Sequence, residues 1–187
     1  CALPIYDGNP KNEDKDYIKS LRRTDGYTGP LFHVSGPSLK LTDIILDGNH
    51  QESSDPLIDV SSGRLELNSG SAITNCRGSE SSQGSAVNVT GSAGLSLNFG
   101  TVSGNISAGK GAVYYNASGR FEVSNRNQIS DNVTPSGKKA NVYLAQGKYI
   151  TVKNDLDISR IGVTTEQLPA ASPGGIASEE GQEVKIA

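Results

Sequence analysis

The sequence predicts an all-β protein, a parallel β-helix (solenoid) of about five coils with irregular N- and C-terminal segments. Three observations support this fold class. A pattern of three short strands recurs about every 26 to 30 residues. Hydrophobic residues make up 34% of the 187 residues and aromatic residues 5%, which suits a thin core of small branched side chains. Glycine is abundant, with 22 copies, and short glycine or serine turns separate the strands.

The first strand of each coil is predicted at five places, each with one apolar residue two positions before another. Its copies lie at 30–34, 56–60, 85–89, 111–115 and 140–144, offset successively by 26, 29, 26 and 29 residues. Alternation of apolar and polar residues is typical of a half-buried strand. We expect the apolar pairs to point inward: Phe32/Val34, Ile58/Val60, Val87/Val89, Val113/Tyr115 and Val142/Leu144.

Two further elements follow each first strand. A second strand is predicted at 39–41, 65–67, 95–97, 121–123 and 150–152, and a third element at 46–49, 73–76, 102–105 and 129–132. Equivalent positions of stacked parallel coils lie above one another, about 4.8 Å apart. Three columns that keep register over four or five copies favour a solenoid over the alternative, a β-sandwich of hairpins.

The last position of the third element predicts a ladder at one corner of the stack, formed by Asn49, Cys76, Asn105 and Asn132. Asparagine tolerates the left-handed backbone of a tight turn, and its amide can bond along the stack. Cys76 interrupts the asparagine column, which favours a buried thiol there. A disulfide between Cys1 and Cys76 is the alternative. Two cysteines are too few for a disulfide scaffold or a zinc site.

The repeat divides the chain into three parts. Residues 30–165 hold the coils, and 158–163 are expected to supply a last third strand. Residues 1–29 are expected to form a loop and a partial coil, with 18–23 completing an earlier, truncated coil. Residues 166–187 are expected to form a loop at 168–175 and an edge strand at 182–186. The chain contains no Met, which indicates a processed or excised piece of a longer protein.

Charge and hydropathy exclude two classes of partner. The net charge is −3, with acidic and basic residues interspersed, so no basic stripe for nucleic acid is expected. No run of 18 apolar residues exists, so no membrane insertion is expected.

Several segments resemble a known family. LTDIILDGN (41–49), GTVSGNISAGKGAVYY (100–115) and KKANVYLAQGKYITVKNDLDISRIGVTT (138–165) look like coils of bacterial surface proteins with a pectin-lyase-like right-handed β-helix. Such coils occur in large, cell-wall-anchored or secreted, adhesin-type chains. The resemblance implies a right-handed helix, an extracellular location at the bacterial surface or after secretion, and a role in adhesion or binding. Right-handed crossovers are also the general rule for parallel strands.

Enzymes of this architecture include polysaccharide lyases and glycosidases, which need convergent carboxylates. The best local cluster is Asp43, Asp47, His50, Glu52 and Asp55. Its simplest interpretation is a turn at 47–49 within a solvated loop. The chain has no Walker loop, no HExxH motif and no recognisable nucleophile motif beside its two histidines. We therefore expect no catalytic residues, no metal and no cofactor.

A binding surface has a concrete form in the sequence. The residue between each inward pair points to solvent, and stacking aligns these residues as one column: His33, Asp59, Asn88, Tyr114 and Tyr143. Tyrosine is enriched in interfaces, so Tyr114 and Tyr143 are the expected anchors. The second strand gives a more charged column, which is typical of a solvated surface: Lys40, Glu66, Ser96, Glu122 and Thr151. The expected ligand is a host protein, including an immunoglobulin, or a host glycan; the alternative is a passive spacer.

Overall fold

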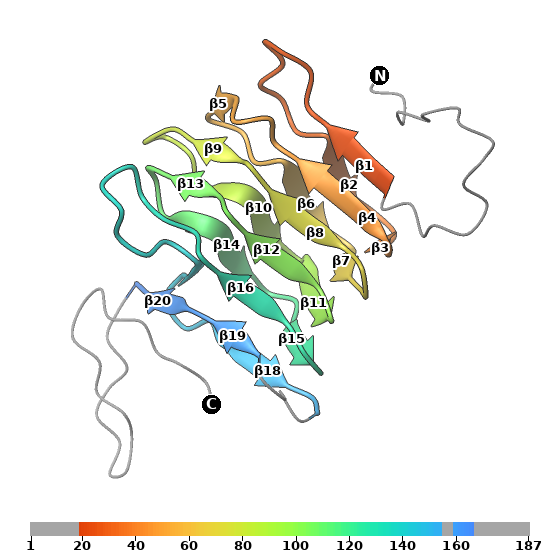
Figure 1. Cartoon of the computed structure of the whole chain (residues 1–187). Helices are drawn as coiled ribbons and strands as arrows, with labels where there is room; N and C mark the ends of the chain where they lie inside the picture. Colours follow the sequence, from red (N-terminus) through yellow and green to blue (C-terminus); the bar gives the residue numbers. More distant parts are fainter. Residues whose placement is uncertain (1–18, 155–158, 167–187) are drawn as a thin grey trace, which may run out of the picture.

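Short strands stack in parallel along one axis in the computed structural model, which describes residues 19–154 and 159–166 (Figure 1). Each coil contributes strands to a first, a second and a third sheet in chain order, and all the strand pairs in these sheets are parallel. The predicted parallel β-solenoid of about five coils is confirmed.

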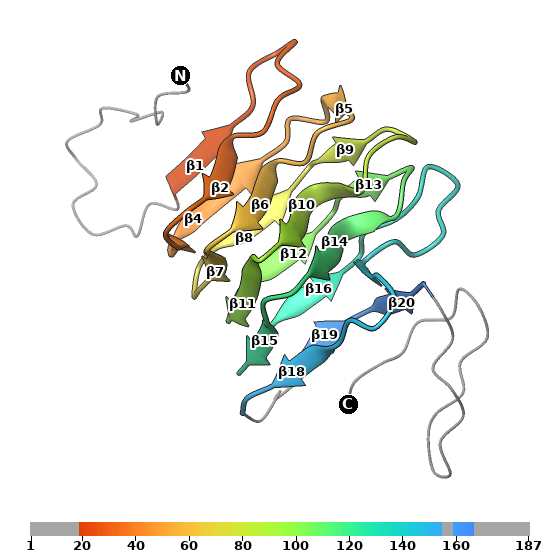
Figure 2. The same ribbon diagram turned by 180° about the vertical axis from the view of Figure 1, so that it is seen from behind.

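The three main sheets have the following strands. The first sheet holds β2 (Phe32–Ser35), β6 (Ile58–Ser62), β10 (Gly84–Gly91), β14 (Gly111–Ala117), β17 (Val142–Leu144) and β20 (Val163–Thr165). The second holds β3 (Leu39–Leu41), β7 (Arg64–Leu67), β11 (Gly94–Asn98), β15 (Phe121–Ser124) and β18 (Ile150–Val152). The third holds β1 (Lys19–Arg22), β4 (Ile44–Asp47), β8 (Ala72–Thr74), β12 (Thr101–Ser103), β16 (Gln128–Ser130) and β19 (Arg160–Ile161). Figure 2 shows the molecule from behind, where the strands of the first and second sheets face the viewer.

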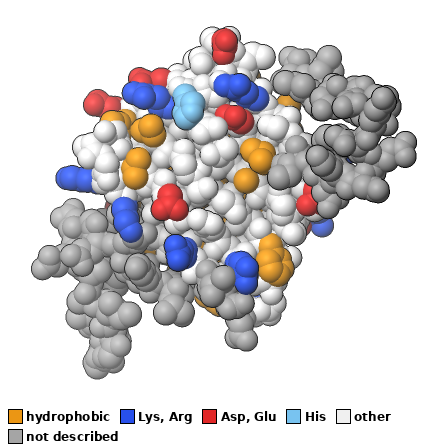
Figure 3. Space-filling model, viewed as in Figure 1, with side chains coloured by type: hydrophobic (Ala, Val, Ile, Leu, Met, Phe, Trp, Pro, Cys, Tyr) orange, Lys and Arg blue, Asp and Glu red, His pale blue; other side chains and the backbone are white. Residues whose placement is uncertain are grey.

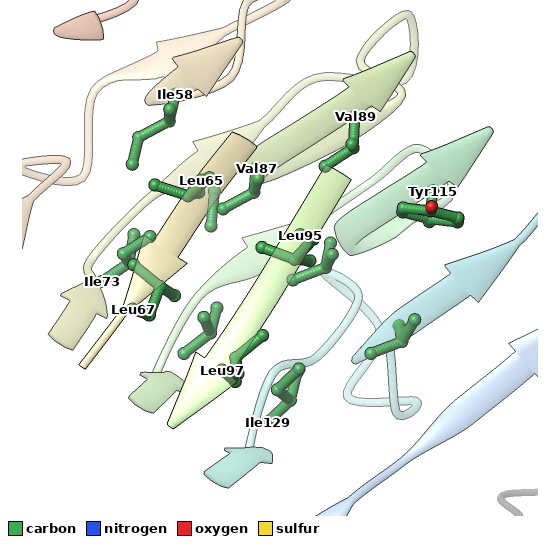
Figure 4. Packing of buried hydrophobic residues seen from close by; sticks show 14 of the residues in the cluster. Ile58, Leu65, Leu67, Ile73, Val87, Val89, Leu95, Leu97, Tyr115 and Ile129 are labelled. Carbon is green, nitrogen blue, oxygen red and sulfur yellow. The ribbon is translucent and has the colours of Figure 1, made fainter. Parts of the chain in front are cut away.

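The core runs through the stack between these three sheets. Alternating residues of every central strand point inward, and Ile58, Val87 and Val113 lie in one column with no exposed surface. Figure 4 shows the same layering for Leu65 and Leu95 of the second sheet. Tyr115 widens the core toward the last coils, where its ring packs 5.2 Å from that of Phe121. Burying small branched side chains in every layer removes apolar surface from water without a wide interior.

A fourth, short sheet departs from the predicted pattern of three strands per coil. It consists of β5 (Glu52–Ser53), β9 (Arg77–Gly78) and β13 (Ile106–Ser107). In the coils of β9 and β13, the two residues directly after the ladder position are extended and pair with their counterparts. Strands of two residues are too short to produce a period-2 pattern, so the sequence offered no signal for them.

The ends of the described chain add partial coils. Leu21 of β1 pairs in register with Leu46, so β1 occupies the place of a third strand in a preceding coil. β20 follows β19 in the chain and pairs with β17, so it is the first strand of a further coil. The predicted loop at 168–175 and edge strand at 182–186 lie outside the described residues, as does Cys1. Within the described ranges, no helix is long and apolar enough to cross a membrane.

On the face seen in Figure 1, the described residues form no concentrated charged or apolar patch. Figure 3 shows acidic and basic side chains interspersed there, with apolar atoms in small separate groups. Side chains that come together across coils lie instead on the first and second sheets and at the corners of the coils.

Candidate functional site

The outward column of the first sheet is brought together by strand register. His33, Asp59 and Asn88 lie on β2, β6 and β10, and Tyr114 and Tyr143 continue the column on β14 and β17. Their side chains face outward because the residues on either side of each fill the core. Thr164 of β20 follows Tyr143 in the same column. The sequence spacing thus places all five predicted site residues on one row.

The polar half of this column is bonded internally. The Nδ1 atom of His33 lies 2.9 Å from Oδ2 of Asp59. The other carboxylate oxygen of Asp59 accepts a hydrogen bond of 2.9 Å from the Asn88 amide. Both oxygens of Asp59 are therefore engaged along the strand stack, and a ligand at this half would have to compete with these contacts.

The aromatic half of the column forms a platform. The rings of Tyr114 and Tyr143 stack with centroids 5.8 Å apart and an interplanar angle of 19°. The Nζ atom of Lys110 lies 4.7 Å from the Tyr143 ring centroid and donates a 3.3 Å hydrogen bond to its hydroxyl. This hydrogen bond from Lys110 to Tyr143 is the main cause that raises the pKa of the lysine, which stays cationic. The platform combines two flat rings with one ammonium group.

Sequence reasoning missed Lys110. It lies in the turn before β14, outside the strand alternation, and reaches a residue 33 positions later in the next coil. A column argument compares equivalent strand positions, so it cannot find a side chain that crosses from a turn to the neighbouring coil.

The outward column of the second sheet is more organised than a solvated surface. Glu122 accepts a 2.7 Å hydrogen bond from Arg64 and lies 3.0 Å from the Nζ of Lys153. Arg64 spans two coils to reach it, and its Nε lies close above the backbone of Gly94. The Arg64 hydrogen bond and then the Lys153 hydrogen bond hold the pKa of Glu122 below its usual range.

Hydrogen bonds connect three of the four predicted members of the corner ladder. The Asn105 side chain accepts a hydrogen bond from the backbone N–H of Cys76, and Asn132 accepts one from the N–H of Asn105. Asn141, which the repeat did not identify, continues the ladder by accepting from Asn132. Asn49 is in register with Cys76, but its amide donates to Asp25 and to the carbonyl of Arg23.

Only the first coil has its left-handed residue at the predicted ladder position. Asn49 has a positive φ of 56°, but Asn105 and Asn132 do not. In the next three coils the left-handed residue directly precedes the ladder residue; these residues are Asn75, Gly104 and Asp131. The ladder asparagines therefore serve through their buried amides, while the preceding residue makes the turn.

Cys76 ends the ladder as a free, buried thiol. Burial raises its pKa to about 12, against the opposing field of Arg23. Arg23 is itself only 1% exposed and donates to the carbonyls of Gly29 and Pro56. Desolvation lowers the pKa of Arg23 from its ordinary value. A protonated thiol with this pKa is a poor nucleophile at neutral pH.

The acidic loop of the first coil does not converge. Asp47 lies 3.9 Å from Arg22 and accepts the backbone N–H of Asn49, as in a turn. Glu52 pairs with Arg77 of the next coil at 2.9 Å, and Asp43 and His50 both have positive φ. The N–H of Asp55 is bonded to the Ser53 hydroxyl. Within residues 19–154 and 159–166, no three His, Cys, Asp or Glu side chains are grouped to hold a metal ion.

Comparison with known proteins adds no relative. No protein family matches the chain, no curated protein matches it, and no solved structure matches it.

Proposed function

We propose that this β-solenoid is a non-catalytic binding module of a larger bacterial extracellular protein of the adhesin type, with a pectin-lyase-like β-helix. The segments at 41–49, 100–115 and 138–165 support this family resemblance. The module acts at the cell surface or after secretion, and contacts a host protein, such as an immunoglobulin, or a host glycan.

One observation carries the proposal: the stacked pair of Tyr114 and Tyr143 with Lys110 beside it on the first sheet. Tyrosine offers a large rigid area with a polar tip, which both sugar rings and protein surfaces contact well. In the polar half, both carboxylate oxygens of Asp59 are already engaged by His33 and Asn88, so the tyrosine half is the anchor. A solenoid holds such a platform rigidly because each strand is bonded to neighbours above and below.

The test compares the full chain with Tyr114→Ala and Tyr143→Ala on a glycan array and in a pull-down from serum. We expect a specific glycan or serum protein to bind the unchanged chain and to lose at least tenfold in affinity with either variant. Tyr27→Ala is the matched control, since Tyr27 is 46% exposed and lies off the column.

The outcomes separate the alternatives. Retained binding by both column variants would contradict the proposed face. Absence of any captured molecule would favour a passive spacer. Cleavage of array polysaccharides would favour a lyase or glycosidase and overturn the non-catalytic proposal.

A further inference from the structure

A small hollow lies where the first and second sheets meet in the last two coils. It has a volume of about 100 Å³ and is bordered by the turn between β14 and β15 and the turn between β17 and β18. Ser118, Arg120, Lys148 and Tyr149 contribute its polar lining, and Tyr115 and Phe121 also line it. The hollow is distinct from the tyrosine platform, which lies on the face of the first sheet.

The charges around this hollow are unbalanced. Both oxygens of Glu122 are engaged by closer partners, Arg64 at 2.7 Å and Lys153 at 3.0 Å. Arg120 reaches the same carboxylate only at 3.8 Å, and its side chain stays 70% exposed. None of the ion pairs within the described residues involves Lys148. Arg120 and Lys148 thus border the hollow without a close anionic partner.

Gly94 contributes to this imbalance. Its missing side chain leaves room for Arg64 to extend from the second coil to Glu122 in the fourth, and a Cβ there would lie 3.2 Å from the Arg64 Nε. Because Arg64 and Lys153 already neutralise Glu122, Arg120 is left as surplus positive charge. Three cations, Arg64, Arg120 and Lys153, lie 2.7, 3.8 and 3.0 Å from the Glu122 carboxylate, which leaves a net charge of +2 (3 − 1) among these four groups. Lys148 adds a further cation to the lining of the hollow.

We infer that this hollow binds a small anionic oxyanion group, the sulfate ester or phosphate ester of a larger ligand. A guanidinium and an ammonium at one rim suit an oxyanion, since arginine binds such groups with two parallel hydrogen bonds. The volume takes one small group, because pockets for whole drug-sized molecules are about 300–1,000 Å³. Tyr149, 72% exposed at the rim, offers its ring to the remainder of the ligand.

The test is a titration of the full chain followed by amide chemical shifts, with sodium sulfate, phosphate or acetate at constant ionic strength. We expect saturable shifts at Gly119 and Gly147 with sulfate or phosphate, and binding of acetate at least fivefold weaker. The sulfate and phosphate arms show which ester group is preferred. Tyr114→Ala should leave this titration unchanged, which separates it from the proposed function.

The double variant Arg120→Gln/Lys148→Gln should bind inorganic sulfate or phosphate at least tenfold more weakly. The double variant Lys40→Gln/Arg77→Gln is the matched control, because it removes two positive charges away from the hollow. Unchanged amide spectra away from the hollow verify that each variant is folded. The inference is overturned if no saturable shift occurs, if acetate binds as tightly, or if both double variants weaken binding equally.

Discussion

At the scale of single residues, Cys76 and Arg23 are the most unusual features of this solenoid. Each is 1% exposed, and the two ionisable groups are near enough to influence each other's pKa. The thiol stays neutral in the folded state, whereas the guanidinium stays charged and donates hydrogen bonds to the backbone carbonyls of Gly29, Asp55 and Pro56. Removal of Arg23 would leave these buried carbonyls without a donor.

Because burial raises the pKa of Cys76, we expect the free energy of unfolding to fall in alkaline solution. Its pKa is about 12 when folded and near its ordinary value of 9.0 when unfolded, so the stabilising difference is fully present below pH 9. It is lost as the pH rises from 9 to 12, by at most about 4 kcal/mol for three pKa units. Urea unfolding between pH 8 and 12 should show this decrease in the unchanged chain.

Cys76→Ala is the control for this prediction. Burial also raises the pKa of Tyr115 to about 12, so part of the alkaline decrease must persist in the variant. In a Cys1→Ala background, a thiol reagent at pH 8 should modify Cys76 only after unfolding. Equal pH dependence with and without the Cys76 thiol, or rapid modification of Cys76 in the folded Cys1→Ala chain, would contradict a buried neutral thiol.

The residue scale also shows where sequence reasoning is weakest. The buried thiol at position 76 was predictable, because it interrupts a column of turn residues. Arg23 was not, since Arg22 and Arg23 are adjacent cations that resemble a solvated pair. The structure separates them: Arg22 is largely exposed, and Arg23 closes the corner between the turns at 24–30 and 53–57.

At the scale of elements, the corner ladder joins consecutive coils where no strand does. Asn105 accepts from the N–H of Cys76 below and donates to Asn132 above. Its amide also donates to the carbonyl of Ile73, so one side chain satisfies polar groups of three turns. Buried backbone groups at a turn need such partners because strands cannot supply them.

Asn105→Ala should lower the free energy of unfolding by about 2–3 kcal/mol, since it leaves buried donors and acceptors without partners. Urea denaturation measures the change. Asn116→Ala is the matched control, because Asn116 is exposed on β14, and should change stability by less than about 0.5 kcal/mol. A similar small effect at Asn105 would show that the ladder contributes little.

The strands of the three main sheets could be predicted from the sequence, but the fourth sheet and the turn geometry could not, for a physical reason. Strands with an alternating inward pair appeared in the sequence, because one face must be apolar to fill the core. The fourth sheet and the exact left-handed positions did not, since they depend on two-residue segments and on turn geometry. Arg64 shows the same limit, because its contact with Glu122 crosses a whole coil above Gly94.

At the scale of the whole molecule, each coil contacts mainly the coils directly above and below it. Stability of such a stack is approximately a sum of coil terms and neighbour interfaces. Removing one complete repeat should therefore preserve the fold. Residues 58–86 form such a unit, because Ile58 and Val87 occupy equivalent positions on β6 and β10.

Deletion of 58–86 should yield a folded, shorter solenoid with the same strand signature in circular dichroism and lower resistance to urea. Deletion of 58–71 is the control, because it removes strands of the first and second sheets but leaves β8 of the same coil. That chain should not fold cooperatively. Comparable folding of both deletions would contradict stacking by whole coils.

The sequence by itself determined the parallel solenoid, the coil spacing and the row that holds His33, Asp59, Asn88, Tyr114 and Tyr143, because register follows from which residues must face the core. Tertiary structure alone decided which neighbours these residues meet. It bonded the polar half of the row to itself, placed Lys110 beside Tyr143 and left Arg120 and Lys148 around one hollow. Those contacts join side chains of different coils, and their geometry arises only when the coils are stacked.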